Sequence, residues 1–533
     1  FLLFYHTRAA EASFGEWLGV LWHGLSLDCT VAGYVTAFPV VVVLASFWIP
    51  LSQRVWRIIL TVYFSLIALV TAAIFAVDLN LYGYWGFRLD GSVLIYLADP
   101  GEALASASWG EVLRQIIIML VYAGAMIWSY RRILRLFRVE PVSLRGRIVP
   151  TVAALLIGGL TFLAIRGGVT VATANVSKVY FSSNMFLNHA ATNPVFSFLS
   201  SVGDNENYAE AYPFFEEERR KTLFEELRGN RPGADAGTPR LLRSDRPNVV
   251  LILLESFGRT IMDETVNGEP VMPNMQRFKR EGVWFENFFA NSFRTDRGQV
   301  AVLCGFPAQT TMSIMKLPRK SATLPSLARS LGREGYRSVF MYGGDLNFTN
   351  QASFMYSTGW EELIWQKDMQ LDAPTSKWGY ADDVVVDLFG DEVEALGRAE
   401  QPFLAGLLTL SSHEPFEVPF AKFDDKLLNA MAFSDAQIGR LIDRLRESPV
   451  WDNLLVVLVA DHGYPYPYDL AYNAPLRHRI PMIWLGGALA APPPNSRYVC
   501  LANRHLRHAS GAAGPSARRV RLQQEYFRCD SAP

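Results

Sequence analysis

The sequence predicts a helical membrane segment followed by an α/β domain with a mostly parallel central sheet. Three observations predict this fold class. Apolar runs long enough to cross a bilayer gather in the first third of the 533 residues. From residue 246 onwards, β-forming runs alternate with helix-forming segments, as in a sheet covered by helices. The β-forming run 248–254 (NVVLILL) has no polar alternation, which indicates a strand buried on both faces.

Four apolar stretches are predicted to cross the membrane: 31–50, 58–77, 115–130 and 148–165. Residues 1–5 resemble the end of a further span, and because the chain begins with Phe1 we expect that an N-terminal part is missing. The alternative is four buried core helices, which would all have to cluster at one end of the chain.

Basic residues predict the orientation of these spans. The loops 51–57 and 131–147 are rich in arginine, whereas the loop 78–114 is mainly acidic. Cytoplasmic loops carry the excess of Lys and Arg, so we expect both basic loops in the cytoplasm. Everything after about residue 166 would then lie outside the cytoplasmic membrane, in the periplasm. The arginines are Arg54, Arg57, Arg131, Arg132, Arg135, Arg138, Arg145 and Arg147.

The rest of the chain divides into three parts. Residues 166–245, after the membrane segment 1–165, are expected to form a linker with a charged amphipathic helix at its centre. Its moderately apolar stretch 184–201 would lie along the membrane surface or pack on the next domain. Residues 246–496 form the predicted α/β domain. Residues 497–533 show no convincing strand or helix period, and we expect a disordered, frame-shifted or otherwise altered tail.

Composition excludes some classes of protein and some kinds of site. A formal net charge of −1 gives no sign of nucleic-acid binding, so no nucleic-acid partner is expected. The four cysteines show neither metal-ligand spacing nor a CxxC motif. A length of 533 residues indicates roughly three to four structural units.

Polar residues follow the predicted strands of the α/β domain at their carboxyl ends. We expect strands at 248–256, 336–344, 402–412 and 454–463, with helices at 321–335, 382–399 and 430–448 between them. Ligands of such sheets bind beyond the carboxyl ends of the strands. One edge of the sheet is therefore the predicted site.

Glu255, Asp461 and His462 stand at two of these strand ends. A buried carboxylate needs a partner, and carboxylate oxygens with an imidazole nitrogen suit a divalent cation such as Zn²⁺ or Mn²⁺. The alternative for Asp461 is a turn in which its side chain caps a following helix.

Thr295 lies in a polar loop that leads into an apolar, helix-like segment. It is either the N-cap of that helix or a nucleophile, activated by a metal on its hydroxyl and placed at the positive end of the helix. Arg294 and Arg297 flank it and would neutralise a phosphate, unless they are solvated surface charges.

His413, Asp345 and Asn347 follow two further strands. We expect His413 to contact a phosphate or to protonate a leaving oxygen. Asp345 and Asn347 would bind the polar head of a substrate, with a local Asx turn as the equal alternative.

The chain resembles the lipoteichoic acid synthase family of membrane phosphoglycerol transferases, within the sulfatase and alkaline phosphatase superfamily. The matching stretches are NVVLILLESFG, the Thr-Asp of SFRTDRGQ, YGGDLNFTN, LTLSSHEPF and VADHG. The sequences YGGDLNFTN and LSSHEPF are closest to those of the Gram-negative members. The resemblance implies a sulfatase-like fold for residues 246–496. It also implies that Glu255, Thr295, Asp461 and His462 bind one Mn²⁺, Mg²⁺ or Zn²⁺, with Thr295 as the nucleophile and His413 in the substrate pocket.

The implied reaction moves a phosphoglycerol or phosphoethanolamine head group from a phospholipid donor, through a phospho-threonine, to a glycan or lipid acceptor in the cell envelope. The family usually has His, Trp and Arg where this chain has Tyr342, Thr349 and Gln351. Because of these departures, phosphoethanolamine is an alternative to phosphoglycerol as the transferred head group. A phosphodiesterase or phosphatase, or an inactive module of the same fold, is the alternative. A sulfatase needs a Cys or Ser at the position that Thr295 occupies.

Overall fold

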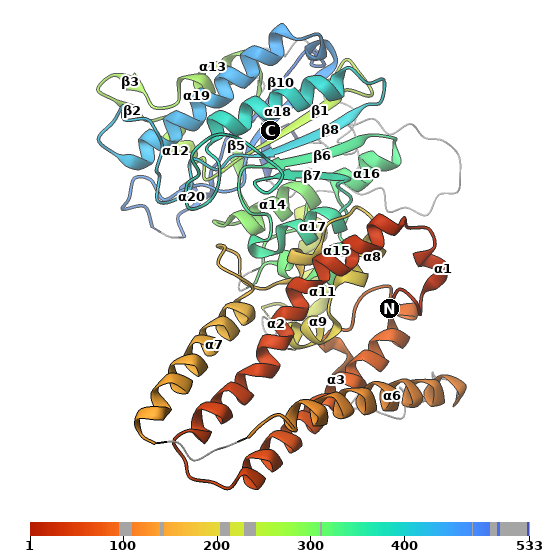
Figure 1. Ribbon diagram of the computed structural model, residues 1–533. Helices are drawn as coiled ribbons and strands as arrows, with labels where there is room; N and C mark the ends of the chain where they lie inside the picture. Colours follow the sequence, from red (N-terminus) through yellow and green to blue (C-terminus); the bar gives the residue numbers. More distant parts are fainter. Residues whose placement is uncertain are drawn as a thin grey trace. The chain divides into compact units, whose positions relative to one another are not determined.

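The computed structural model describes residues 1–94, 109–138, 143–202, 214–228, 241–309, 312–471, 473–490, 498–501 and 530–531 (Figure 1). The chain forms two compact units, Phe1–Tyr212 and Pro213–Pro533. The expected linker 166–245 is therefore divided, because its first half packs within the first unit. Each unit is described by itself below.

The first unit contains four helices long and apolar enough to cross a membrane: Phe14–Ser46, Gln53–Trp85, Trp109–Leu134 and Arg145–Arg166. They are α2 (Phe14–Ser46), α3 (Gln53–Trp85), α6 (Trp109–Leu134) and α7 (Ile148–Arg166), the last preceded by the 3₁₀ turn η2 (Arg145–Arg147). The first predicted span ends too late at residue 50, since Pro50 disfavours helix in the residue before it. Residues 2–5, expected as the end of a span, form a turn before α1 (His6–Ala9).

The helices of the first unit pack in two pairs, α3 on α6 and α2 on α7. At one end, Arg57 Nη2 and Gln53 Nε2 donate to the carbonyl oxygen of Phe137, at 3.0 and 3.1 Å. Trp48 Nε1 donates to Thr151 Oγ1 at 3.1 Å at the same end. Both arginine-rich loops thus lie together, as an even number of spans between them requires.

The opposite end of the first unit is covered by short helices. These are α8 (Met185–Ala191) and α9 (Pro194–Ser201), with η1 (Gly91–Val93) and η3 (Val176–Val179) beside them. A buried ion pair joins Arg88 to Asp78 at 2.9 Å, and Arg88 also donates to the carbonyl oxygen of His189. The stretch 184–201 therefore packs on the long helices of its own unit.

The second unit is built on a seven-stranded sheet in the order β4-β10-β9-β1-β8-β6-β7. The five strands from β9 to β7 run parallel, β10 runs antiparallel to β9, and β4 runs antiparallel to β10 and therefore in the same direction as the five. The four predicted strands are its centre, and β4, β7 and β10 add to the edges. Their bounds are β1 (Asn248–Leu254), β4 (Val283–Trp284), β6 (Arg337–Tyr342), β7 (Glu362–Trp365), β8 (Phe403–Leu408), β9 (Leu454–Ala460) and β10 (Met482–Leu485).

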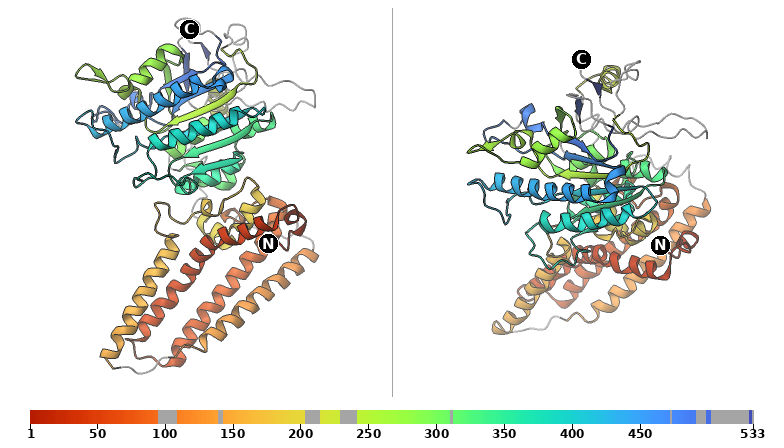
Figure 2. Two further views of the ribbon diagram at one scale, coloured as in Figure 1. Left: turned by 45° about the horizontal axis from the view of Figure 1, so that its top comes forward. Right: turned by 90° about the horizontal axis from the view of Figure 1, so that it is seen from above.

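Helices cover this sheet, and α18 (Asp382–Gly397) and α19 (Lys426–Glu447) pack side by side (Figure 2). The predicted helix 321–335 is two pieces, α15 (Pro318–Ala322) and α16 (Leu327–Arg333), because Pro325 interrupts it. The charged helix expected in the linker is α11 (Glu217–Arg228). Other elements are α12 (Arg259–Met262), α13 (Pro273–Glu281), α14 (Thr295–Cys304), α17 (Gln351–Ser357), α20 (Pro475–His478), β2 (Thr265–Val266), β3 (Glu269–Pro270), η4 (Ile314–Lys316), η5 (Phe348–Asn350) and η6 (Pro449–Asn453).

The C-terminal stretch contains two short strands that the sequence did not indicate. β11 (Tyr498–Leu501) pairs in parallel with β5 (Asn287–Phe289), and β12 (Asp530–Ser531) pairs with β11. The expectation of no strand is wrong at these residues, because the backbone of β5 offers a free edge to pair with. The rest of 497–533, with its predicted disorder or frame shift, lies outside the described residues.

A buried carboxylate of α19 holds the start of α13. Asp435 accepts hydrogen bonds from the backbone N–H groups of Asn274 and Met275, at 3.0 and 2.8 Å, and from the Asn274 amide. We expect Asp435→Ala to lower the free energy of unfolding by about 2–4 kcal/mol, since buried donors lose their acceptor. Asp443→Ala, which breaks a half-exposed ion pair with Arg277 between the same helices, should cost less than about 1 kcal/mol. Thermal and urea unfolding of the full chain measure both values. An equal loss of unfolding free energy in the two variants would contradict the prediction.

Candidate functional site

The strand register brings four carboxyl ends to one edge of the sheet. Leu254 of β1 lies beside Ala460 of β9, and Leu253 lies beside Leu408 of β8. Leu408 in turn pairs with Tyr342 of β6. The residue that follows each strand, including Glu255 and Asp461, is therefore delivered to the same edge.

Glu255, Asp461 and His462 form a compact buried cluster at this edge. One ligand atom from each of the three lies within 4.8 Å of the others. His462 Nε2 is 3.5 Å from Glu255 Oε1 and 3.6 Å from Asp461 Oδ2. No helix follows Asp461 within the described stretch 462–471, so its interpretation as a helix cap is wrong.

Thr295 completes this cluster from another element. It is the first residue of α14, and Arg294 holds the N-cap position without a capping side-chain bond, so Thr295 is not the cap. Its hydroxyl donates to Glu255 Oε2 at 3.0 Å and lies 3.4 Å from His462 Nε2. The four residues of the predicted quartet are thus within reach of one small ligand.

Neighbouring polar groups fix the orientation of the carboxylates. Ser256 adopts a left-handed backbone, with φ of 62°, that turns the chain sharply after β1. Its N–H donates to Asp461 Oδ1 at 3.0 Å, and its hydroxyl donates to Glu255 Oε1 at 2.8 Å. Thr409 Oγ1 accepts from the Glu255 N–H at 2.9 Å. Sequence analysis missed Ser256 and Thr409, whose only signal is their place beside strand ends.

The charges of the cluster fit a cation. Burial, and then the charge of Glu255, raise the pKa of Asp461 to about 7. Burial opposes ionisation of His462, but Asp461 and Glu255 raise its pKa to about 9. Burial also opposes ionisation of Glu255, but the hydrogen bond and charge of His462 lower its pKa to about 2. Asp461 Oδ2 is buried without a hydrogen-bond partner among the described residues, as expected of a ligand atom.

A cavity of about 460 Å³ opens beside Thr295. Its lining combines cationic and aromatic side chains, the acidic Asp296 and Glu414, and Glu255 and His462 of the cluster. His413 lines it, with its ring 4.5 Å from that of Trp378 and its Nδ1 2.8 Å from the carbonyl oxygen of Glu414. Arg294 and Arg477 also line the cavity, and the guanidinium of Arg477 lies over the ring of Phe293. Such a lining suits an anionic ligand with an organic part.

Three predicted substrate residues are not among those that line this cavity. Asp345 Oδ1 accepts a hydrogen bond from the N–H of Asn347 at 2.9 Å, which is the geometry of an Asx turn. Arg297 lies over the ring of Phe293, 5.9 Å from its centre. Their role in binding stays a prediction. Neither Arg477, in the short helix α20, nor Trp378, in the irregular segment before α18, was predicted, because no apolar strand or helix pattern marks either position.

Residues 247–502 match the sulfatase family. The chain is similar to phosphoglycerol transferase I of Xanthomonas campestris pv. campestris, with 35% identity over 251 residues, which are 42% of this chain and 35% of that protein. Lipoteichoic acid synthase 1 of Bacillus subtilis is 26% identical over 247 residues, 40% of this chain and 36% of that protein.

A solved structure of a lipoteichoic acid synthase from Listeria monocytogenes aligns with a TM-score of 0.48 and 20% identity, over 53% of this chain and 75% of that one. The chain spans about a third of the length of the curated superfamily relatives that it matches.

The position of Thr295 depends on a close approach between α14 and the end of β9. A Cβ on Gly298 would lie 2.2 Å from the carbonyl oxygen of Asp461. We expect Gly298→Ala to move α14 and to weaken binding of Mn²⁺ or Zn²⁺ roughly 10–100-fold. Gly332→Ala in α16, where a Cβ meets open space, should leave metal affinity unchanged. Isothermal titration calorimetry of both variants checks this, and equal affinities would contradict it.

Metal binding should release protons. A bound cation requires an ionised Asp461 and a neutral His462, whereas the raised pKa values of about 7 and 9 keep protons on both groups at and below pH 7. Affinity for Zn²⁺ should therefore fall as the pH falls from about 9 to 6. Calorimetry at pH 7 in two buffers of different ionisation enthalpy should show release of one to two protons. A pH-independent affinity without proton release would contradict it.

Proposed function

We propose that the protein is a membrane-anchored, metal-dependent transferase that moves a phospholipid head group to an acceptor in the cell envelope. One observation carries the proposal: the Thr295 hydroxyl lies 3.0 Å from Glu255, at the N-terminus of α14 and at the wall of a cavity that suits an anion. The names of the relatives, phosphoglycerol transferase I and lipoteichoic acid synthase, support the reaction type.

The reaction has two displacements at phosphorus. In the first, a bond forms between Thr295 Oγ1 and phosphorus while the bond to the diacylglycerol oxygen breaks. Diacylglycerol leaves with a proton, and the head group remains on the threonine as a phosphodiester. In the second, a hydroxyl of a glycan or lipid acceptor attacks phosphorus and Thr295 leaves with the proton of that hydroxyl. Water in place of the acceptor would make the protein a phosphodiesterase.

Each residue has a part in these steps. Glu255 accepts the hydrogen bond of the Thr295 hydroxyl. This hydrogen bond would direct the lone pairs of Thr295 Oγ1 into the cavity. The free N–H groups of α14 face the phosphate. His413, which lines the cavity, would give the proton to the leaving oxygen. Glu255, Asp461 and His462 would hold a Mn²⁺, Mg²⁺ or Zn²⁺, with Thr295 as fourth ligand. Such an ion, when bound, lowers the pKa of a coordinated hydroxyl and neutralises charge on phosphate.

The donor is proposed to be a phospholipid with a phosphoglycerol or phosphoethanolamine head. Thr349 and Gln351, which replace the Trp and Arg of the resembled family, line the cavity. Gln299 donates to Gln351 at 3.1 Å, so this position is polar but uncharged. The relatives' names favour phosphoglycerol. Four spans with arginine-rich cytoplasmic loops would anchor the catalytic domain outside the inner membrane, within reach of the donor.

Thr295→Ala should abolish turnover and the covalent intermediate, because the attacking oxygen is gone. The full chain is incubated with phosphatidylglycerol or phosphatidylethanolamine and then digested. The mass of the peptide that contains residue 295 is measured by mass spectrometry. The wild type should gain the mass of one phosphoglycerol or phosphoethanolamine group, which also names the donor.

Thr295→Ser is the matched control, because it keeps the hydroxyl and should still form the adduct. An adduct that persists in Thr295→Ala would refute the assignment. Release of free head group with no labelled acceptor would favour the phosphodiesterase. A wild type that binds neither Mn²⁺ nor Zn²⁺ and forms no adduct would favour an inactive module.

A further inference from the structure

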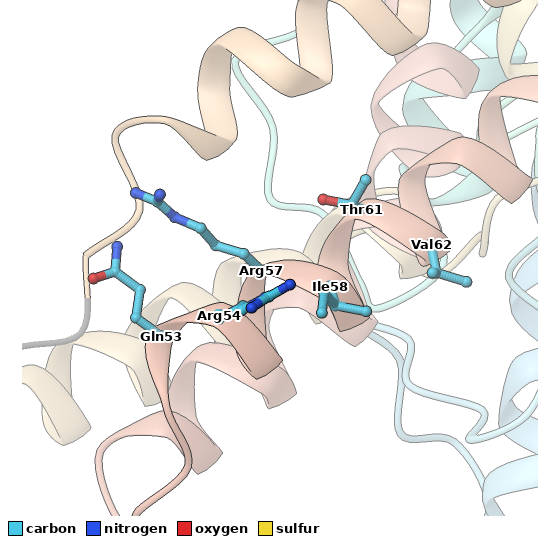
Figure 3. A pocket seen from close by; sticks show the side chains of 6 residues that line it. All are labelled: Gln53, Arg54, Arg57, Ile58, Thr61 and Val62. Carbon is cyan, nitrogen blue, oxygen red and sulfur yellow. The ribbon is translucent and has the colours of Figure 1, made fainter.

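An arginine-lined groove lies on the first unit, far along the chain from the quartet. It has a volume of about 500 Å³ and is lined by the first three turns of α3: Gln53, Arg54, Arg57, Ile58, Thr61 and Val62. Figure 3 shows these six side chains: the guanidinium group of Arg54 lies beside Ile58, and the side chain of Arg57 extends to the side where Gln53 lies. The groove is at the end of the unit where the two arginine-rich loops meet.

The groove carries positive charge that the described residues do not balance. The first turn of α3 contains no acidic residue, although a helix N-terminus is its positive end. Among the described residues no carboxylate pairs with Arg54 or Arg57. Arg57 Nη2 donates a hydrogen bond to the carbonyl oxygen of Phe137. Its Nε is buried and has no hydrogen-bond partner in the described part of the chain.

An apolar stripe continues from the arginines along the same helix. Ile58, Val62 and Leu66 are 53, 63 and 60% exposed, and Leu69 and Val70 extend the stripe. From residue 58 to residue 70 a helix rises about 18 Å, close to the roughly 15 Å hydrocarbon thickness of one leaflet. The groove therefore offers cations at the level of a head group and an apolar face at the level of an acyl chain.

We propose that this groove binds an anionic phospholipid, with its phosphodiester on Arg54 and Arg57 and an acyl chain along Ile58, Val62 and Leu66. A planar guanidinium can donate two parallel hydrogen bonds to phosphate oxygens. The site is separate from the Thr295 cavity, so it would serve to hold or regulate the membrane unit rather than to carry out the reaction. A phospholipid and a free phosphate ion can both accept hydrogen bonds from these guanidinium groups. Only the phospholipid has an acyl chain that would contact Ile58, Val62 and Leu66.

The test measures lipid binding to the full chain in detergent by native mass spectrometry. Dioleoyl phosphatidylglycerol is compared with dioleoyl phosphatidylcholine and with inorganic phosphate. The wild type should bind one phosphatidylglycerol at least about tenfold more tightly than phosphatidylcholine, and Arg54→Gln/Arg57→Gln should lose that preference. The control Arg131→Gln/Arg135→Gln removes the same charge from exposed positions outside the groove and should keep it.

Other outcomes would overturn the proposal. These are an equal loss in the control pair, or displacement of the lipid by inorganic phosphate at equal concentration. Arg54→Lys/Arg57→Lys keeps the charge and should retain most of the preference; if it binds as weakly as the glutamine pair while melting like the wild type, the proposal fails.

Glu140 is the single acidic residue of the loops 51–57 and 131–147, and it lies outside the described residues. If Glu140 neutralises the arginines within the chain, Glu140→Gln should raise the affinity for phosphatidylglycerol several-fold, which would also overturn the proposal. An unchanged affinity supports it.

Discussion

The site depends on the placement of β1 between β8 and β9. This placement buries the carboxylates of Glu255 and Asp461, which are 3% and 0% exposed, next to each other beyond the strand ends. Two neighbouring buried carboxylates cannot both stay ionised without a positive partner. His462 supplies one positive charge, and the raised pKa of Asp461 shows that this charge does not suffice. The sheet thus leaves negative charge that is not fully neutralised, at a group of residues that could hold a cation.

The parts of this architecture that follow from hydrophobic pattern could be predicted from the sequence. The uniform apolar runs of β1, β8 and β9 identify strands buried on both faces, and the polar residues just after them mark the edge where a ligand binds. The order of the strands in the sheet could not be obtained this way, because parallel pairing depends on contacts between segments far apart in the sequence, such as Val249 with Leu404 and with Leu455. The short outer strands β4, β7 and β10 were not predicted, because so few residues carry too little periodicity.

The quartet was predictable because Glu255, Asp461 and His462 follow apolar strand-like runs and Thr295 precedes an apolar helix-like one, and the structure brings all four together. Asp345, Asn347 and Arg297 were selected by nearness in sequence to a strand end or to Thr295. Side chains close in sequence can point to different surfaces, and these three are outside the cavity lining. Arg477 lines the cavity from α20, a helix of only 4 residues, and Trp378 lines it from an irregular segment, so neither stands in a periodic run that predicts which way its side chain points. Sequence reasoning therefore found the residues that hold charge and missed those that shape the space around them.

The spacing of the quartet along the chain has a thermodynamic consequence. Thr295 is 40 residues from Glu255 and 167 residues from His462, so an unfolded chain holds these ligands far apart. A cation can bind them together only in the folded domain, and its binding free energy then adds to the stability of that fold in proportion to the logarithm of its concentration. Metal supply outside the cytoplasm would thereby set the lifetime of the domain against proteolysis as well as its activity.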